Sequence, residues 1–190
     1  MPGNTTENST ENWTTALRYI AGRKAAEESL GFLAHISATV RGTAGEADVV
    51  PAAAKACVPF MASAVSLDAP ATHPGPVVQS PAEFSAALDG VRALALKGPG
   101  PQLVISGHEG TAKQTDPAHL ELLREWGADS AVALSLDYRG VPGGLLVLVR
   151  GEAHRRGPLG PGDLALVSEV ADRIAAFNAF ATHAAAGAGR

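Results

Sequence analysis

Cysteine, aromatic residues, positive charge and long apolar runs are all scarce in this sequence. Its single cysteine, Cys57, excludes an internal disulfide framework and any cysteine-rich zinc site. Lys and Arg number 15 against 19 Asp and Glu, a net charge of −4, so the basic footprint of a nucleic-acid-binding protein is missing. The longest aliphatic run, Leu145–Val149, is far shorter than the roughly 20 residues that span a bilayer. We therefore expect neither nucleic acid nor a membrane among the partners.

What is present is enough apolar material for a folded domain. The chain has 190 residues, of which 46% are hydrophobic and 18% charged, and this balance is unlike that of a disordered chain. The N-terminal segment is polar and lacks the basic start and apolar core of a secretory signal. Together with the single cysteine, this favours a cytoplasmic location.

Apolar residues recur at helical spacing in five segments of the chain. Glycine lowers helix stability, so a bend near Gly22 is expected in the first of them. Residues 1–11 are interpreted as a disordered polar tail, 12–183 as a single domain and 184–190 as a flexible C-terminus. The expected helices cover residues 12–40, 48–61, 80–96, 116–127 and 161–183.

Four further segments have the pattern of strands, at residues 63–68, 102–106, 130–138 and 144–150. Arg139-Gly140 lies between the last two and predicts an antiparallel hairpin. Leu145–Val149 is apolar on both faces, so this strand is expected at the centre of the sheet with both faces covered. Residues 69–80, with three prolines, are interpreted as a loop. The order of elements predicts an α+β domain with an antiparallel sheet and helices on its faces.

Several phrases of the sequence add a family resemblance to this pattern. His119–Leu136 combines a helix, a glycine and a strand; Gly144–Val149 is an apolar strand; and Leu159-Gly-Pro-Gly-Asp-Leu164 opens the last helix. In this order the phrases resemble the GAF domain family of small-molecule sensor modules, over roughly residues 30–180. These segments are most similar in sequence to GAF domains found beside metal-dependent serine/threonine phosphatase domains in bacteria.

The resemblance implies an antiparallel sheet of five or six strands with the first and last helices on one face. Those helices often pair in dimers, and shorter helices and loops enclose a ligand pocket on the other face. The resemblance thus implies a cytosolic bacterial regulatory module, a homodimer through its terminal helices, with an unidentified small molecule and a signalling protein as partners. The residues that map onto the pocket are Val104, Ser106, His108, His119, Leu123, Trp126, Ser130 and Val132.

Two alternatives remain open beside the sensor. A ligand-free dimerisation or protein-interaction module fits the lack of room for an output domain in this chain. A haem-binding sensor would use His108 or His119 as the axial ligand, although no His-x-x-x-His pair or other metal motif accompanies them. No cofactor is required by the sequence. No metal site and no catalytic set is expected: Ser106, His108 and Glu109 are close in sequence, but neighbouring loop side chains seldom converge on one atom.

Two further features are given structural interpretations. Cys57 is followed by Val58, unlike a chromophore-attaching cysteine, and is expected to be a small core residue. The basic cluster His154-Arg155-Arg156 is interpreted as a solvated loop, with contact to an acidic partner as the alternative.

Overall fold

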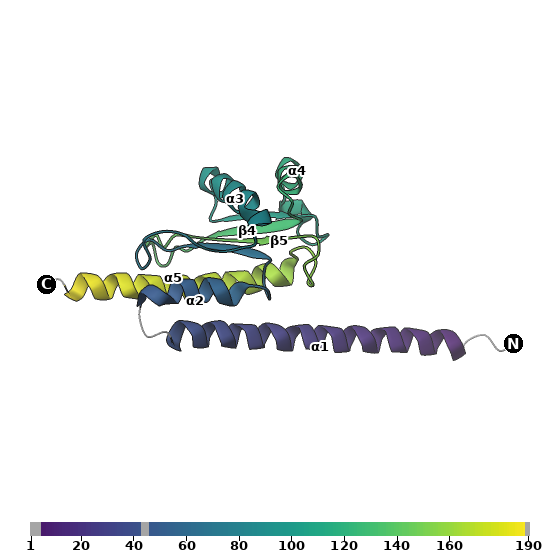
Figure 1. The fold of residues 1–190 in the computed structure, drawn as a ribbon. Helices are drawn as coiled ribbons and strands as arrows, with labels where there is room; N and C mark the ends of the chain where they lie inside the picture. The colour runs from purple at the N-terminus through teal and green to yellow at the C-terminus, as the bar shows by residue number, and fades with distance from the viewer. Residues whose placement is uncertain (1–4, 43–45, 189–190) are drawn as a thin grey trace.

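The protein, seen in a computed structural model that describes residues 5–42 and 46–188, is built around one antiparallel sheet (Figure 1). Its five strands lie in the order β2-β1-β5-β4-β3, and neighbours in this order are all antiparallel. The strands are β1 (Ala64–Asp68), β2 (Val77–Gln79), β3 (Gln102–Ser106), β4 (Ser130–Ser135) and β5 (Leu145–Arg150).

Helices cover both faces of the sheet, as Figure 1 shows. One face carries α5 (Pro161–Ala188) and α2 (Glu46–Cys57), with α1 (Thr5–Gly42) packed outside them. The opposite face carries α3 (Ser85–Lys97) and α4 (Pro117–Glu125), each preceded by a short 3₁₀ turn, at Ala82–Phe84 and Ala112–Gln114. The expected α+β architecture is therefore confirmed.

Strand β5 divides the core into two clusters because its side chains alternate between the faces. Leu146 and Leu148 belong to the cluster under α1, α2 and α5, whereas Val147 and Val149 belong to the cluster under α3 and α4. All four are buried to 1% exposure or less, and burying each side chain contributes about 1.5–3 kcal/mol. The expectation of a central strand covered on both faces is confirmed.

The β4–β5 connection turns at Arg139-Gly140, as expected. Both residues have positive φ angles, 51° and 80°, and the backbones of Tyr138 and Val141 exchange two hydrogen bonds. This is the type I′ geometry that matches the twist of a hairpin. Past the turn, Gly144 has φ 116°, and a Cβ there would overlap the carbonyl oxygen of Asp68, so the approach of β5 to β1 requires glycine.

The open edge of β3 is closed by one side chain. The hydroxyl of Thr115 accepts a hydrogen bond from the backbone N–H of Ser106 at 3.0 Å. It also lies within donating distance of two carbonyl oxygens of the strand, those of Ser106 at 3.1 Å and Val104 at 3.4 Å. This oxygen therefore meets backbone groups that a sixth strand would otherwise pair with.

Helices α1 and α5 run in the same direction but are displaced along their axes. The guanidinium of Arg173 in α5 donates to the Ser37 hydroxyl of α1 at 3.1 Å, where the two helices lie side by side. Figure 1 shows the N-terminal part of α1 projecting past the sheet at one end and the C-terminal part of α5 projecting at the other. In α1, Phe32 and Ile36 pack against the body, whereas Trp13, Leu17 and Ile20 are 69%, 63% and 61% exposed.

Several boundaries differ from the sequence-based expectations: α2 ends at Cys57 and not at 61, α3 begins at Ser85 and not at 80, and β4 ends at Ser135 and not at 138. Helix α1 begins at Thr5, within the segment expected to be disordered, and passes Gly22 without a break; residues 1–4 lie outside the described part. Helix α5 continues to Ala188, into the segment expected to be flexible. Strand β2 lies inside the expected loop 69–80, because Val77–Gln79 pair with Val65–Leu67 between the prolines and Ser80. In the described segments, no helix has the length and apolarity needed to cross a membrane.

Candidate functional site

The structure separates the residues expected to share a pocket. Side chains alternate between the two faces along β3 and β4, and Val104 and Val132 lie in the cluster under α5. The paired serines Ser106 and Ser130 are two residues away from these valines, so they lie on the same face of the sheet. Leu123 of α4 lies in the cluster on the opposite face, and Trp126 packs against that cluster. These residues therefore do not form one wall.

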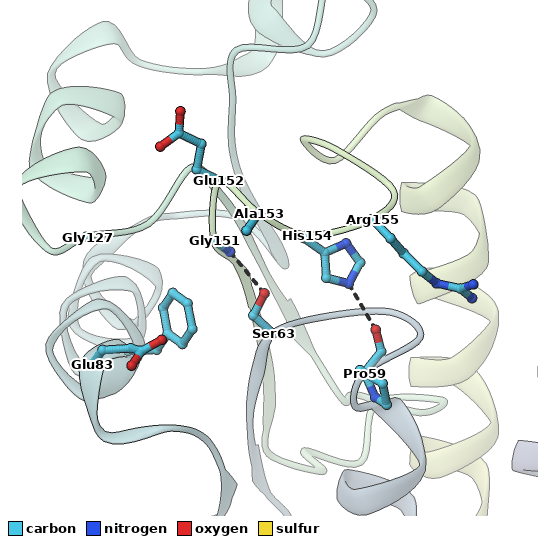
Figure 2. Close-up of a pocket in the computed structure, with 10 residues that line it drawn as sticks. Pro59, Ser63, Glu83, Gly127, Gly151, Glu152, Ala153, His154 and Arg155 are labelled. Carbon is cyan, nitrogen blue, oxygen red and sulfur yellow. Dashed lines mark hydrogen bonds between the residues drawn. The ribbon is translucent and has the colours of Figure 1, made fainter.

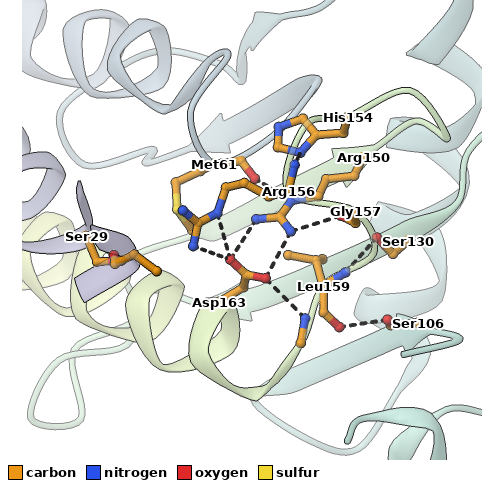
Figure 3. A network of polar contacts seen from close by, with 12 residues as sticks. Ser29, Met61, Ser106, Ser130, Arg150, His154, Arg156, Gly157, Leu159 and Asp163 are labelled. Atoms are coloured by element: carbon orange, nitrogen blue, oxygen red, sulfur yellow. Dashed lines mark hydrogen bonds and ion pairs between the residues drawn. The ribbon is translucent and has the colours of Figure 1, made fainter. Parts of the chain in front are cut away.

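The two serines fix the β5–α5 loop, residues 151–160. The hydroxyl of Ser106 donates to the carbonyl oxygen of Leu159 at 2.7 Å, and the hydroxyl of Ser130 accepts from the Leu159 N–H at 3.0 Å (Figure 3). Thr111 adds a hydroxyl that donates to the same carbonyl at 3.0 Å. Both serines are fully buried, so their polar atoms are used for structure.

The two candidate histidines have different surroundings. The Nδ1 atom of His108 accepts the N–H of Gly110 at 3.0 Å, and its ring packs against Gly160. The Nδ1 atom of His119 is buried without a hydrogen-bond partner. Neither histidine lines any of the cavities described below, so nothing in them supports the haem alternative. Among the described residues, no group of three His, Cys, Asp or Glu side chains is arranged to hold a metal ion.

Side chains fill the space between the sheet and the helices α3 and α4. Leu88, Val91, Ile105 and Leu123 are each buried to 3% exposure or less in one apolar cluster. The ring of Trp126 lies so close to Gly90 that a Cβ there would overlap it. The face on which the resemblance implies a ligand pocket is therefore closely packed in this structure.

A cleft of about 500 Å³ lies instead at one end of the sheet (Figure 2). Four connections meet there: the segment before β1 with Pro59 and Ser63, the 3₁₀ turn with Glu83 and Phe84, Gly127 after α4, and residues 151–155 after β5. A smaller hollow of about 350 Å³, lined by Arg124, Ala128 and Asp129, adjoins the cleft through their shared residues Gly127 and Glu152. A third cavity, of about 320 Å³, lies between the hairpin turn and α5.

Hydrogen bonds hold the walls of the cleft together. Gly151 donates its N–H to the Ser63 hydroxyl at 3.1 Å, and a Cβ at Gly151 would overlap the ring of Phe84. His154 places Nε2 3.0 Å from the Pro59 carbonyl oxygen, which can only accept, while its Nδ1 accepts the Arg156 N–H at 3.3 Å. Burial lowers the pKa of His154 below 6.5, against the opposing effect of the Pro59 hydrogen bond. The neutral ring therefore fits these contacts.

Behind the cleft lies a buried ion-pair network that sequence analysis did not identify (Figure 3). The guanidinium of Arg150, which is fully buried, bonds both carboxylate oxygens of Asp163 at 3.0 Å. It also donates to the carbonyl oxygens of Met61 at 2.7 Å and Gly157 at 3.1 Å. Arg156 binds the same carboxylate, at 2.9 and 3.0 Å. The β5–α5 loop is thus tied to the first turn of α5.

The arginines determine the charge state of Asp163. Burial alone raises the pKa of a carboxyl group, but hydrogen bonds and positive charge from Arg150, with contributions from the Gly160 N–H and Arg156, outweigh it. The pKa of Asp163 therefore lies below its ordinary value of 3.8. The loop His154-Arg155-Arg156, expected to be solvated, is solvated only in part. Arg155 is exposed, whereas Arg156 is mostly covered and ion-paired.

Comparison with known proteins places this architecture among GAF domains at the level of fold. No family model matches the chain, and no curated protein matches its sequence. The phycoerythrobilin-bound GAF domain of a cyanobacterial phytochrome is 14% identical, with a TM-score of 0.52 over 83% of this chain and 97% of that one. The GAF domain of a phosphoenolpyruvate-protein phosphotransferase from Coxiella burnetii is 16% identical, with a TM-score of 0.51 over 85% and 98%. The fold that the resemblance implied is therefore present.

Proposed function

We propose that this chain is a GAF-type regulatory module that forms a homodimer through its terminal helices and passes a signal along them in a bacterial cytosol. The observation that carries the proposal is the unpartnered apolar stripe on α1. Trp13, Leu17 and Ile20 are spaced by four and three residues, so they lie on one side of the helix. All three are more than 60% exposed, beyond the part of α1 that packs on the body.

A second copy is the occupant that suits this stripe. The spacing of four and three residues is that of a two-stranded coiled-coil seam. Covering the stripes of two copies would gain on the order of 10 kcal/mol, which is comparable with the entropy cost of association. We therefore expect a reversible dimer that depends on each of the three side chains.

Sedimentation equilibrium of the whole chain at tens of micromolar tests the dimer. The wild type is expected to be dimeric, and Leu17→Glu and Ile20→Glu are expected to be monomeric because each places a charge in the seam. Tyr19→Glu is the matched control, since Tyr19 is 72% exposed but points to another side of the helix. A monomeric wild type, or equal dissociation by all three variants, would contradict the proposal.

The close packing under α3 and α4 favours the version of this function that needs no ligand there. In that version the dimer docks on a signalling protein, and the resemblance to GAF domains beside phosphatase domains makes a phosphatase regulator our candidate partner. Mixing the chain with such a regulator and following the sedimentation of both tests the docking. Docking that is lost in Leu17→Glu would support it, whereas separate sedimentation at micromolar concentration would count against it.

A second candidate function, the small-molecule sensor, is favoured by the cleft at the end of the sheet. Native mass spectrometry of the chain purified from its own cells would show a bound small molecule as added mass. A strong absorption band near 400 nm, roughly where haem absorbs, would indicate the haem alternative and make His108→Ala and His119→Ala the first variants to compare. A clean ligand-free mass would favour the docking module.

A further inference from the structure

We propose that the cleft at the end of the sheet binds a small zwitterion of amino-acid to dipeptide size, and that the β5–α5 loop transmits its binding to helix α5. This inference rests on the sensory form of the proposed function. It places the ligand at the end of the sheet, beside Phe84 and Gly127, and not within the closely packed cluster between the sheet and the helices α3 and α4.

The shape of the cleft suits a ligand of this size. Its volume is about 500 Å³, within the range of small-molecule sites, and its inner surface is formed by small or apolar residues such as Pro59, Phe84 and Gly151. Gly127 is exposed, so its backbone atoms are open to a ligand, whereas the ring of Phe84 covers Gly151. A ligand in the cleft can contact the end of α4 together with residues 152–155.

Unpaired charges of opposite sign flank this apolar surface. Glu83 and Glu152 are exposed and, within the described part of the chain, form no ion pair. Arg155 also has no carboxylate partner there; its guanidinium lies 5.2 Å from the centre of the Phe60 ring. Figure 2 shows Arg155 and His154 toward the α5 side and the two carboxylates away from it. A ligand with an ammonium group at one end and a carboxylate at the other matches this distribution.

The loop that lines the cleft is the same loop that holds the start of α5. Residues 151–155 form one wall, and the next residue, Arg156, binds the Asp163 carboxylate in the first turn of the helix. The N–H of Leu164 donates to the carbonyl oxygen of Gly160, the last residue of the loop, at 3.0 Å. A ligand that orders the wall therefore acts on the first hydrogen bonds of α5.

Titration of the ¹⁵N-labelled whole chain, with free L-amino acids and glycyl dipeptides as probes, tests the site by NMR. The expected result is saturable shifts of the amides of residues 83, 127 and 151–155. The N-acetyl derivative and the amide of the tightest probe each lack one charge, and each is expected to bind up to about fivefold more weakly. Absence of saturable shifts up to millimolar probe, or equal affinity for the two derivatives that each lack one charge, would overturn the proposal.

Charge-neutral variants separate a specific site from general surface binding. Glu152→Gln and Arg155→Gln are each expected to weaken the tightest probe about fivefold, because each removes one charged contact. Glu121→Gln is the matched control, since its carboxylate is exposed on α4 and does not line the cleft. Similar affinities for the cleft variants and the control would overturn the proposal.

Hydrogen exchange of the Leu164 amide tests the transmission. Saturating probe is expected to slow this exchange about tenfold in the wild type, and by less than twofold in Arg156→Gln, which keeps the cleft residues but loses the tie to Asp163. Unchanged exchange in the saturated wild type would overturn the transmission. Sedimentation of the same samples distinguishes failure of this proposal from failure of the proposed dimer. A chain that binds no zwitterion but dimerises through α1 would overturn only the zwitterion site.

Discussion

Replacing Asp163 by Asn gives the sharpest test of what holds α5 to the sheet. The substitution keeps the shape of the side chain but removes the negative charge between Arg150 and Arg156. Arg150 is fully buried, so its charge would remain out of water with only the carbonyl oxygens of Met61 and Gly157 and a neutral amide to receive it. Breaking a buried ion pair from one side in this way costs about 3–5 kcal/mol.

The lower end of that range is the expected value, because the Asn oxygen still accepts one hydrogen bond. A loss of about 3 kcal/mol lowers the melting temperature of a chain of this length by roughly 6–12 °C. Urea unfolding at pH 7, followed by circular dichroism, measures the free energy of unfolding directly. Glu169→Gln on the same helix is the matched control, because the Arg173–Glu169 pair is exposed and contributes less than about 1 kcal/mol.

The effect of pH provides a second measure of the same carboxylate. The pKa of Asp163 is lower in the folded chain than the ordinary 3.8, so the unfolded chain binds this proton first as the pH falls. The stability that Asp163 contributes is therefore complete above about pH 5 and is lost as the pH falls through 3.8 toward the folded-state pKa. The wild type and Asp163→Asn should converge in stability over this interval. A loss at pH 7 no larger than that of Glu169→Gln would refute the reasoning.

Three substitutions and one labelling reaction test separate parts of the structure. Gly90→Ala should destabilise the chain by about 1–3 kcal/mol and shift the Trp126 fluorescence, because the new Cβ overlaps the indole. In Gly31→Ala the new Cβ meets nothing within 4 Å, so this variant should raise the free energy of unfolding by up to about 1 kcal/mol. Burial raises the pKa of the Cys57 thiol to about 12, so a thiol reagent at pH 8 should label it only after unfolding. His154 has its pKa lowered below 6.5, so its contribution to stability is present above pH 6.5 and lost below it; His154→Gln should remove that pH dependence. Rapid Cys57 labelling of the folded chain, or an unchanged profile in His154→Gln, would contradict these expectations.

The elements with the strongest local signals were predictable from the sequence. Leu145–Val149 had no polar residue on either face, which only a covered central strand satisfies, and Arg139-Gly140 supplied the turn chemistry for the hairpin. Strand β2 was missed because three residues between prolines give no pattern of their own; they become a strand through pairing with β1. Gly22 was expected to bend α1, but a single glycine with open space around it lowers helix stability without interrupting it.

The candidate site was harder to predict because it depends on contacts between distant segments. Ser106 and Ser130 suggested polar groups of a ligand pocket, whereas each instead bonds the backbone of Leu159, more than 25 residues away along the chain. Arg150 ends an apolar strand, a place where an arginine usually reaches solvent, and only the approach of Asp163 from α5 explains its burial. The cleft itself is lined from four connections, so no single stretch of sequence carries its signature.

The hydroxyl of Thr115 has a consequence for how copies of this chain can meet. A five-residue strand at the border of a sheet is a template on which another chain can add its own strand and so continue the sheet without limit. Thr115 occupies the backbone N–H of Ser106 and approaches the carbonyl oxygens of Ser106 and Val104, which are the groups such growth would need first. At the other border, β2 has only three residues. Ordered aggregation through either border is therefore disfavoured. Contact between copies is expected instead at surfaces that form closed assemblies, in which no further copy can add.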